Sequence, residues 1–291
     1  MNELELCAAI RDGAARYAGL TDQPSRTTER ARLLHLLERL RLSRGAPIIT
    51  RRVSGAELRA DPVLRGAAVV HLDLMFRSSV TADEVLFTAN RGIVRLGFHS
   101  QLEDVPVGVV LAQPCRRLVR SRAELFDVKG PQLGESSVVM PYAVAASPGR
   151  VGVGGELIRA CIADCAKLSS PPRVVTLSTL TGMRARVIRM VDGVSPLDPR
   201  DADSAVLRAQ LLELLAVGEQ PETVPEPARS WLAAENRLFA ASTDYAVGNF
   251  HRAMGASLVG LSEGADPSDS DALWARAYFD YGLATSSLAP A

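Results

Sequence analysis

The chain has 291 residues and a mass of 31.1 kDa, which suits one large domain or two modest ones with an ample core. Basic and acidic side chains number 33 each, and this balance argues against a strongly basic surface, so we expect no nucleic-acid partner. Apolar runs stay well short of the roughly 18–20 residues that a membrane helix needs, so we also expect no membrane partner.

The redox and cellular setting follows from the start of the chain and its cysteines. The segment Met1–Glu5 is acidic and lacks the basic region and apolar stretch of a signal peptide. Cys7, Cys115, Cys161 and Cys165 are too few and too scattered for a disulfide framework in a chain of this length. We therefore expect a cytoplasmic protein with reduced thiols.

Residues 1–45 are predicted to form two helices. The first covers Glu3–Tyr17, and the stretch around Pro24 separates it from the second. Leu33, Leu37 and Leu40 share one face of that second helix. This pattern is typical of a small helical cap or of an element that forms a homodimer.

Residues 46–65 read as a link, after which the sequence takes on β-type character. Val105–Ala112 is almost continuously apolar, as a central buried strand would be, and a turn precedes it at His99–Asp104. The other predicted strands are Ala67–Leu74, Glu84–Ala89, Ile93–Phe98 and Ser136–Ala146.

A strand, a glycine-rich turn, a helix and a further strand then follow in order. The turn is Ser147–Gly155, the helix is Glu156–Leu168 and the strand is Arg173–Leu177. The remaining predicted elements are a helix at Ala205–Ala216 inside an inserted segment, a helix at Ser230–Ala241, and a last strand or turn at Leu273–Gly282.

The glycine turn is suited to a pyrophosphate, because glycines let backbone N–H groups converge and the following helix adds partial positive charge. It matches neither the order of the dinucleotide fingerprint nor a Walker loop, which would need a following Gly-Lys-Ser/Thr. A glycine-rich connection without a ligand stays open as the alternative. The turn looks like the acyl-CoA turn of the Gcn5-related acyltransferase fold, although Gly149 replaces the usual Gln or Arg. Its candidate binding residues are Gly149, Arg150, Val151, Gly152, Val153, Gly154 and Gly155.

A second block lies near the carboxy terminus. Asn249-Phe-His251-Arg-Ala-Met-Gly255-Ala256 resembles the Pro-Val-Ala-Asn-Phe-His-x-x-Asn-Gly-Ala block of malonyl-CoA decarboxylases. Further blocks resemble that family in the same order over about residues 67–282: Phe98–Ala112, Pro148–Ile162, Thr176–Met183, Ala265–Ser268 and Tyr278–Tyr281.

The resemblance implies an α+β fold, a Gcn5-related acyltransferase-like mixed sheet with flanking helices. We expect a short helical segment over residues 1–62, the acyl-CoA catalytic domain over 63–284 and a disordered tail over 285–291. The family's long helical amino-terminal domain serves assembly; about 65 residues remain here, so a homodimer through these helices replaces the usual tetramer as our expectation.

The resemblance also implies the chemistry. The family's serine falls at Ser178, on a loop after a strand, and its histidine at His251. Ser178 would contact the substrate carboxylate, and His251 would protonate the carbanion left by CO2, a role that a near-neutral pKa fits. Asn249 would hold the histidine loop and bind substrate, and Tyr281 would orient the pair. No metal or organic cofactor is expected, because the thioester itself accepts the electrons.

Three functions stay open at this point. The first is decarboxylation of malonyl-CoA, or of a related malonyl thioester on CoA or an acyl carrier protein. The second is acyl transfer with His251 as the base, and the third is non-catalytic acyl-CoA binding. Gly152, Thr179–Thr181 and Met254 depart from the family pattern near the predicted site, which favours a changed substrate or reaction.

The other candidate ligands are read as structural. Ser178 could also be a helix N-cap or turn serine, and His251 a packed histidine. We expect His99 to lie in a turn, His35 on a solvated helix face and His71 in a strand. Cys161 and Cys165 are four residues apart on a helix, but no second pair completes a metal site, so core packing is expected.

Overall fold

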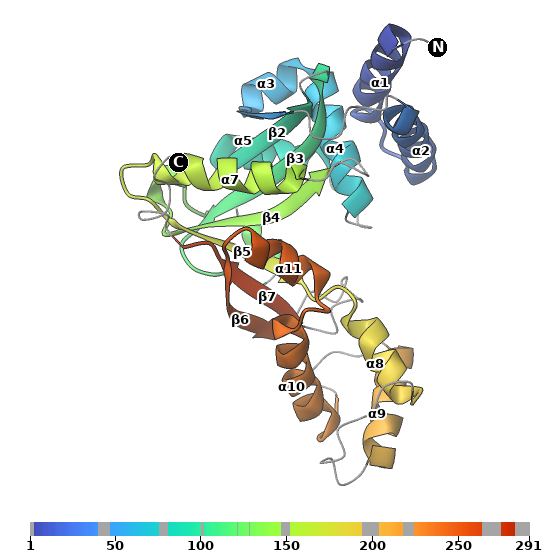
Figure 1. The fold of residues 1–291 in the computed structure, drawn as a ribbon. Coiled ribbons are helices and arrows are strands. Elements are labelled where there is room, and N and C mark those ends of the chain that lie inside the picture. The colour runs from blue at the N-terminus through green and yellow to red at the C-terminus, as the bar shows by residue number, and fades with distance from the viewer. Residues whose placement is uncertain are drawn as a thin grey trace. The chain divides into compact units, whose positions relative to one another are not determined.

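The computed structural model divides into two compact units (Figure 1). The first lies within Met1–Arg117 and Lys129–Val174, and the second consists of Leu118–Val128 and Val175–Gly282. Each unit is described by itself. The residues that the structure describes are 3–39, 47–75, 81–99, 102–120, 122–127, 129–146, 152–193, 204–217, 224–263 and 275–282.

The amino-terminal part of the first unit is helical, as predicted. α1 (Glu3–Tyr17) has the predicted bounds, and α2 (Gln23–Arg39) carries the leucine-rich face. Both helices pack near α4 (Pro62–Met75), and α1 crosses α4 closely at Gly66. The domain boundary predicted between residues 62 and 63 falls in the first turn of α4. The predicted disordered tail at 285–291 lies outside the described residues.

A buried ion pair connects α2 and α4. The Asp73 carboxylate accepts a hydrogen bond from the Arg26 guanidinium at 2.5 Å, and it also bonds to the Tyr17 hydroxyl. Burial and the neighbouring carboxylate raise the pKa of Tyr17 to about 12, so this hydroxyl stays protonated at neutral pH. Three segments of the chain are thus joined by one charge-assisted cluster.

The predicted strands Ala67–Leu74 and Glu84–Ala89 are wrong, because both segments are helical. The first lies in α4, whose apolar residues are buried on several sides and so show no clear helical period. The second lies in α5 (Ala82–Arg91), which begins with a capping box between Thr81 and Glu84. The predicted link at 46–65 also contains regular structure, namely β1 (Ile48–Arg52), α3 (Gly55–Ala60) and the start of α4.

The sheet of the first unit has four antiparallel strands in the order β1-β2-β3-β4. Three of them confirm predicted strands: β2 (Ile93–His99), β3 (Leu102–Cys115) and β4 (Val138–Ala146). α7 (Val153–Ala166) covers one face, where a Cβ on Gly108 would come within 2.6 Å of Val153. A short 3-10 helix, η1 (Leu133–Glu135), leads into β4.

The second unit contains a small antiparallel sheet with helices packed on it. β5 (Arg173–Thr179) pairs in parallel with β4 through its first two residues and antiparallel with β7 (Ala275–Asp280) through its last five. β6 (Ser257–Glu263) completes the order β5-β7-β6 at the sheet edge. The helices are α6 (Arg122–Leu125), α8 (Met183–Val191), α9 (Ser204–Val217), α10 (Ala228–Ala241) and α11 (Ala246–Ala253).

Two features complete the fold. The seven strands run in the order β1-β2-β3-β4-β5-β7-β6 and contain both parallel and antiparallel pairs, so the predicted mixed sheet with flanking helices is confirmed. Among the described helices, none combines the length and the apolar character that spanning a bilayer requires.

The close crossing at Gly66 gives a test of the amino-terminal packing. A Cβ at this position would lie 1.7 Å from the carbonyl oxygen of Ala14, and backbone cannot yield as a side chain can. We expect Gly66→Ala to lower the free energy of unfolding by about 1–3 kcal/mol, despite alanine's better helix propensity. Urea denaturation measures the loss. Gly134→Ala is the control, since a Cβ there meets nothing within 4 Å, and equal effects would contradict the packing.

Candidate functional site

Ser178 and His251 meet inside the second unit. Ser178 lies on β5 opposite Ala277 of β7, and His251 lies on α11. The Ser178 Oγ and the His251 Nε2 are 2.7 Å apart, and both side chains are buried. The structure thus brings together two residues that are 73 positions apart in the sequence.

The predicted position of Ser178 on a loop is wrong, because β5 continues to Thr179. The antiparallel ladder with β7 extends from Val175 to Thr179 and holds this serine inside the sheet. The hydroxyl is therefore held by a strand that is paired with β7 along this stretch, rather than by a turn. A rigid element places a reacting group more precisely than a loop does.

Tyr281 provides the second partner of the histidine. Its hydroxyl lies 2.5 Å from the His251 Nδ1, directly beyond the end of β7. Both ring nitrogens thus contact hydroxyl groups, one buried and one partly exposed. A neutral imidazole has one donor and one acceptor nitrogen, so it can donate to Ser178 and accept from Tyr281, or the reverse. The three side chains form a continuous chain along which a proton can move.

Aromatic packing controls the charge of the histidine. The His251 ring stacks on Phe279 with 4.9 Å between ring centroids, and Phe250 meets its edge at 5.2 Å. Burial in this setting lowers the pKa of His251 to about 4. The near-neutral pKa assumed from the sequence is therefore wrong, and the ring is neutral at physiological pH.

Tyr245 determines how β5 and α11 approach each other. Its hydroxyl donates to the carbonyl oxygen of Thr179 at 2.6 Å, next to Ser178 in the chain. Its ring packs fully buried at the start of α11, where a Cβ on Gly248 would come within 2.3 Å of it. Sequence reasoning missed this residue, although Tyr245, Gly248 and His251 recur every three positions on one helical face.

Asn249 faces away from the Ser178–His251 pair. Its amide nitrogen donates to the carbonyl oxygen of Thr243 at 2.6 Å, and its amide oxygen accepts from Arg252 at 2.7 Å. These bonds tie α11 to the turn before it, so the predicted histidine loop is a helix that Asn249 helps to hold. A role of Asn249 in binding substrate stays a prediction.

The predicted phosphate turn belongs to the first unit. Gly149, Arg150 and Val151 lie outside the described residues. Gly152 caps α7 with a φ of 92°, a conformation that favours glycine. The helix begins at Val153, earlier than predicted, so Val153, Gly154 and Gly155 form its first turn. The N–H groups of a first turn have no partner within their helix, but their binding of phosphate stays a prediction.

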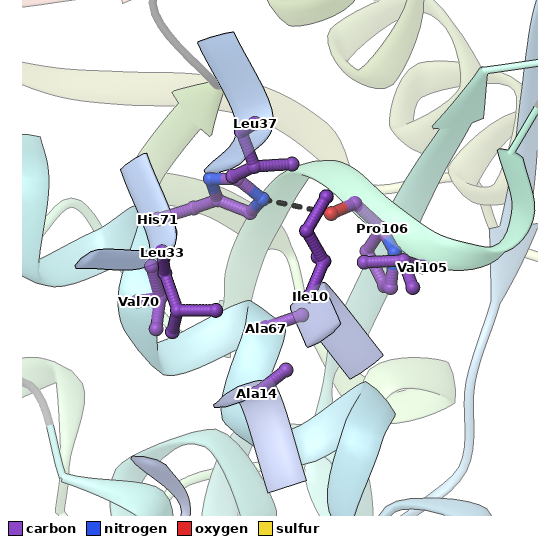
Figure 2. Close-up of a pocket in the computed structure, with 9 residues that line it drawn as sticks. All are labelled: Ile10, Ala14, Leu33, Leu37, Ala67, Val70, His71, Val105 and Pro106. Atoms are coloured by element: carbon purple, nitrogen blue, oxygen red, sulfur yellow. Dashed lines mark hydrogen bonds between the residues drawn. The ribbon is translucent and has the colours of Figure 1, made fainter. Parts of the chain in front are cut away.

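The remaining histidines and cysteines hold structural positions. His71 lies on α4 and not in a strand, and its Nε2 contacts the Pro106 carbonyl oxygen at 2.8 Å beside a small apolar cavity (Figure 2). His99 is buried at the end of β2, and His35 is exposed on α2. Cys161 and Cys165 are buried free thiols. Within the described part of the chain, no group of three or more His, Cys, Asp or Glu is placed to hold a metal ion.

Comparison with known proteins gives structural likeness without sequence-level matches. No family model matches the chain, and no curated protein sequence does. The fold is similar to solved malonyl-CoA decarboxylases from Agrobacterium vitis (TM-score 0.65, 19% identity, covering 89% of this chain and 70% of that one) and Rhodopseudomonas palustris (0.61, 19%, 97% and 70%). A third, from Cupriavidus metallidurans, has a TM-score of 0.58 at 14% identity, covering 87% and 66%. These likenesses confirm the fold predicted from the sequence.

The low pKa of His251 predicts a defined acid sensitivity. The unfolded state binds a proton near pH 6.5, whereas the folded state binds it only near pH 4. The unfolded state therefore holds more protons in this window, and the free energy of unfolding falls as pH falls, by up to about 1.4 kcal/mol per pH unit. We expect His251→Gln to lose the part of this pH dependence of the free energy of unfolding that His251 causes. Urea unfolding at several pH values between 4 and 6.5 measures it.

The control for this prediction is direct titration. In NMR spectra of the wild type, the His251 ring signals should stay those of the neutral form until near pH 4. His71 also has a pKa lowered by burial, and it is present in both proteins, so the difference between them isolates His251. Titration of His251 near pH 6.5 would contradict its burial.

Proposed function

We propose that the chain is a malonyl-CoA decarboxylase-like enzyme, which converts malonyl-CoA or a related malonyl thioester into acetyl-CoA and CO2. The observation that carries this proposal is the hydrogen-bonded chain from Ser178 through His251 to Tyr281. It joins the three residues that the sequence resemblance assigns to catalysis. The likeness of the fold to solved malonyl-CoA decarboxylases supports the same conclusion.

The chemistry needs hydrogen-bond donors rather than a metal. When the bond to the carboxylate carbon breaks, its electron pair moves into the thioester, whose oxygen becomes negative, and CO2 leaves. A donor held near that oxygen stabilises the enolate more strongly than it stabilises the substrate. A neutral imidazole carries one N–H group, so it can donate such a hydrogen bond directly, or through the Ser178 hydroxyl.

The final step adds a proton to the α-carbon. With a pKa of about 4, His251 carries no extra proton at neutral pH, so the proton comes from the neutral N–H or from the Ser178 hydroxyl. The Tyr281 hydroxyl, at the other ring nitrogen and partly exposed, then returns a proton to the ring and takes one up from solvent, which balances the proton consumed by decarboxylation. This route replaces the imidazolium donor expected from the sequence.

The carrier of the acyl group is CoA or a carrier-protein phosphopantetheine, since both present the thioester at the end of a pantetheine arm that carries phosphate at its other end. Gly149–Gly155 would bind the phosphates. The departures from the family pattern at Thr179–Thr181 and Met254 lie beside Ser178 and His251 in the chain, and they favour a substrate related to malonyl, such as methylmalonyl.

Acyl transfer is the second candidate, and the charge of His251 favours it. A neutral imidazole beside a hydroxyl can accept a proton, which is what a base for acyl transfer to an amine or hydroxyl must do. Both reactions start from an acyl thioester, but only transfer releases free CoA. Measurement of the products therefore separates the two.

The first activity test incubates the pure protein with malonyl-CoA and follows CO2, acetyl-CoA and free CoA. Decarboxylation gives acetyl-CoA without free CoA. We expect Ser178→Ala and His251→Ala each to reduce turnover by about 100-fold or more. Ser257→Ala on β6 and His35→Ala on α2 are matched controls at exposed positions and should keep full turnover.

Three results would contradict the assignment. Retained turnover in both site variants would remove Ser178 and His251 from the mechanism. CoA binding without any product, with or without an amine acceptor, would make the chain a non-catalytic acyl-CoA-binding protein. Free CoA with an acylated acceptor would select acyl transfer.

The position of Tyr245 gives a second activity test. Tyr245→Phe removes the bond to Thr179 and keeps the ring, so Ser178 and His251 lose part of their alignment. We expect kcat to fall about tenfold with little change in KM, because misplacement of reacting groups slows the chemical step. Steady-state kinetics measures both constants.

Tyr278→Phe is the matched control. It removes a similar hydrogen bond, from the Tyr278 hydroxyl to the Val119 carbonyl oxygen at 2.8 Å, and alternation along β7 places this side chain on the opposite face from Phe279, which stacks on His251. Both variants should lose about 1 kcal/mol of stability, but only Tyr245→Phe should lose kcat. Equal losses of kcat would show that general destabilisation, not alignment, is responsible.

A further inference from the structure

α9 is apolar on the side that faces solvent as well as on the side that faces the core. Leu207, Leu211 and Leu214 are buried in the core of the second unit. On the opposite side, Val206 and Leu212 are 44% and 50% exposed. A helix that is apolar all round is normally buried on all sides, so we expect the solvent-facing side of α9 to be covered by another protein surface.

The exposed residues have a regular spacing. Ala205, Ala209, Leu212 and Ala216 recur at intervals of four, three and four, and all four are exposed. This spacing is that of the a and d positions of a coiled coil, and it lies opposite the buried leucines. Three alanines among the four residues let a second helix approach closely.

The charged residues show which second helix fits. Arg208 lies on one flank of this stripe and Glu213 on the other, five residues further along. In the described part of the chain, neither side chain has an ion-pair or hydrogen-bond partner. By contrast, the polar Gln210 is used inside the unit, where it accepts from the Ala228 amide.

Symmetry then selects the orientation. In a parallel pair of helices related by a twofold axis along them, each flank faces the opposite flank of the partner. Arg208 would therefore meet the partner subunit's Glu213, and the symmetry would repeat this ion pair. In an antiparallel pair like flanks face each other, so both charges would lie against uncharged side chains.

We propose that α9 is a self-association element, through which two copies of this chain form a parallel, twofold-symmetric helix pair. The stripe forms its apolar seam, and Arg208 and Glu213 set its orientation and register. This pairing differs from the association through the amino-terminal helices that the sequence suggested, and it does not depend on the proposed reaction. One helix pair is a small interface, so the dissociation constant should be about micromolar or weaker.

Sedimentation velocity of the full chain over about a hundredfold range of concentration tests the proposal. The wild type should shift from monomer to dimer, and Leu212→Glu should stay monomeric. Leu238→Glu changes an exposed leucine of α10 and should behave like the wild type. Leu4→Glu on α1 should do the same. A wild type that stays monomeric, or a dimer lost in Leu4→Glu but kept in Leu212→Glu, would overturn the proposal.

Charge exchange tests the orientation. Arg208→Glu and Glu213→Arg should each weaken dimerisation about tenfold or more, because each places like charges together. An equimolar mixture of the two variants should dimerise like the wild type, since every Glu then meets an Arg across the seam. A mixture that stays monomeric would overturn the parallel pairing, and a stripe that binds a different protein without forming a dimer would overturn self-association.

Discussion

The hydrogen bond between Ser178 and His251 is the interaction on which the proposed chemistry depends. It joins a strand to a helix inside an apolar core, and neither element would place its residue alone. β5 fixes the serine through its ladder with β7, whereas α11 fixes the histidine through Tyr245 at its start. A buried polar pair of this kind costs free energy unless its bonds are complete, and here the second ring nitrogen is also occupied.

Completing the bonds with hydroxyl groups has a consequence that a carboxylate would not have. A carboxylate beside the imidazole would stabilise its charged form and raise its pKa. A hydroxyl group can donate or accept a hydrogen bond, so either neutral tautomer of His251 fits between Ser178 and Tyr281. Stacking on Phe279 excludes water from one face of the ring. The site therefore keeps a neutral histidine, which can donate to an oxygen that gains charge or accept a proton from a hydroxyl. Decarboxylation and acyl transfer use these two capacities respectively.

Much of the fold could be predicted from the sequence, except where tertiary contacts determine whether a segment forms a helix, a strand or a loop. Val105–Ala112 and Ile93–Phe98 are apolar strands buried in the sheet, and their pattern sufficed. Ala67–Leu74 has an equally apolar pattern, yet it forms a helix. The pattern misled because a helix that is buried on several sides lacks the apolar period by which a helix is told from a strand. The strand position of Ser178 depends on pairing with β7, about 100 residues later in the chain, which no local pattern contains.

The candidate site divides in the same way. Ser178, His251 and Tyr281 could be selected by resemblance, because the family's blocks carry them in order. Their electrostatics could not, since the pKa of His251 depends on rings brought together by folding. Tyr245 was missed because an aromatic residue at a helix start looks like ordinary core.

Glycines with positive φ explain why short blocks could carry a resemblance at such low identity. Gly182 lies at the start of α8 and Gly255 just beyond the end of α11, each in one of the matching blocks, with φ values of 98° and 86°. A side chain is strained at such positions, so the backbone geometry restricts the sequence there. These matches therefore report a shared backbone path and not a shared reaction. The reaction depends on the side chains that this backbone path positions. Gly182 and Gly255 lie close in sequence to Ser178 and His251, whose side chains are hydrogen-bonded to each other.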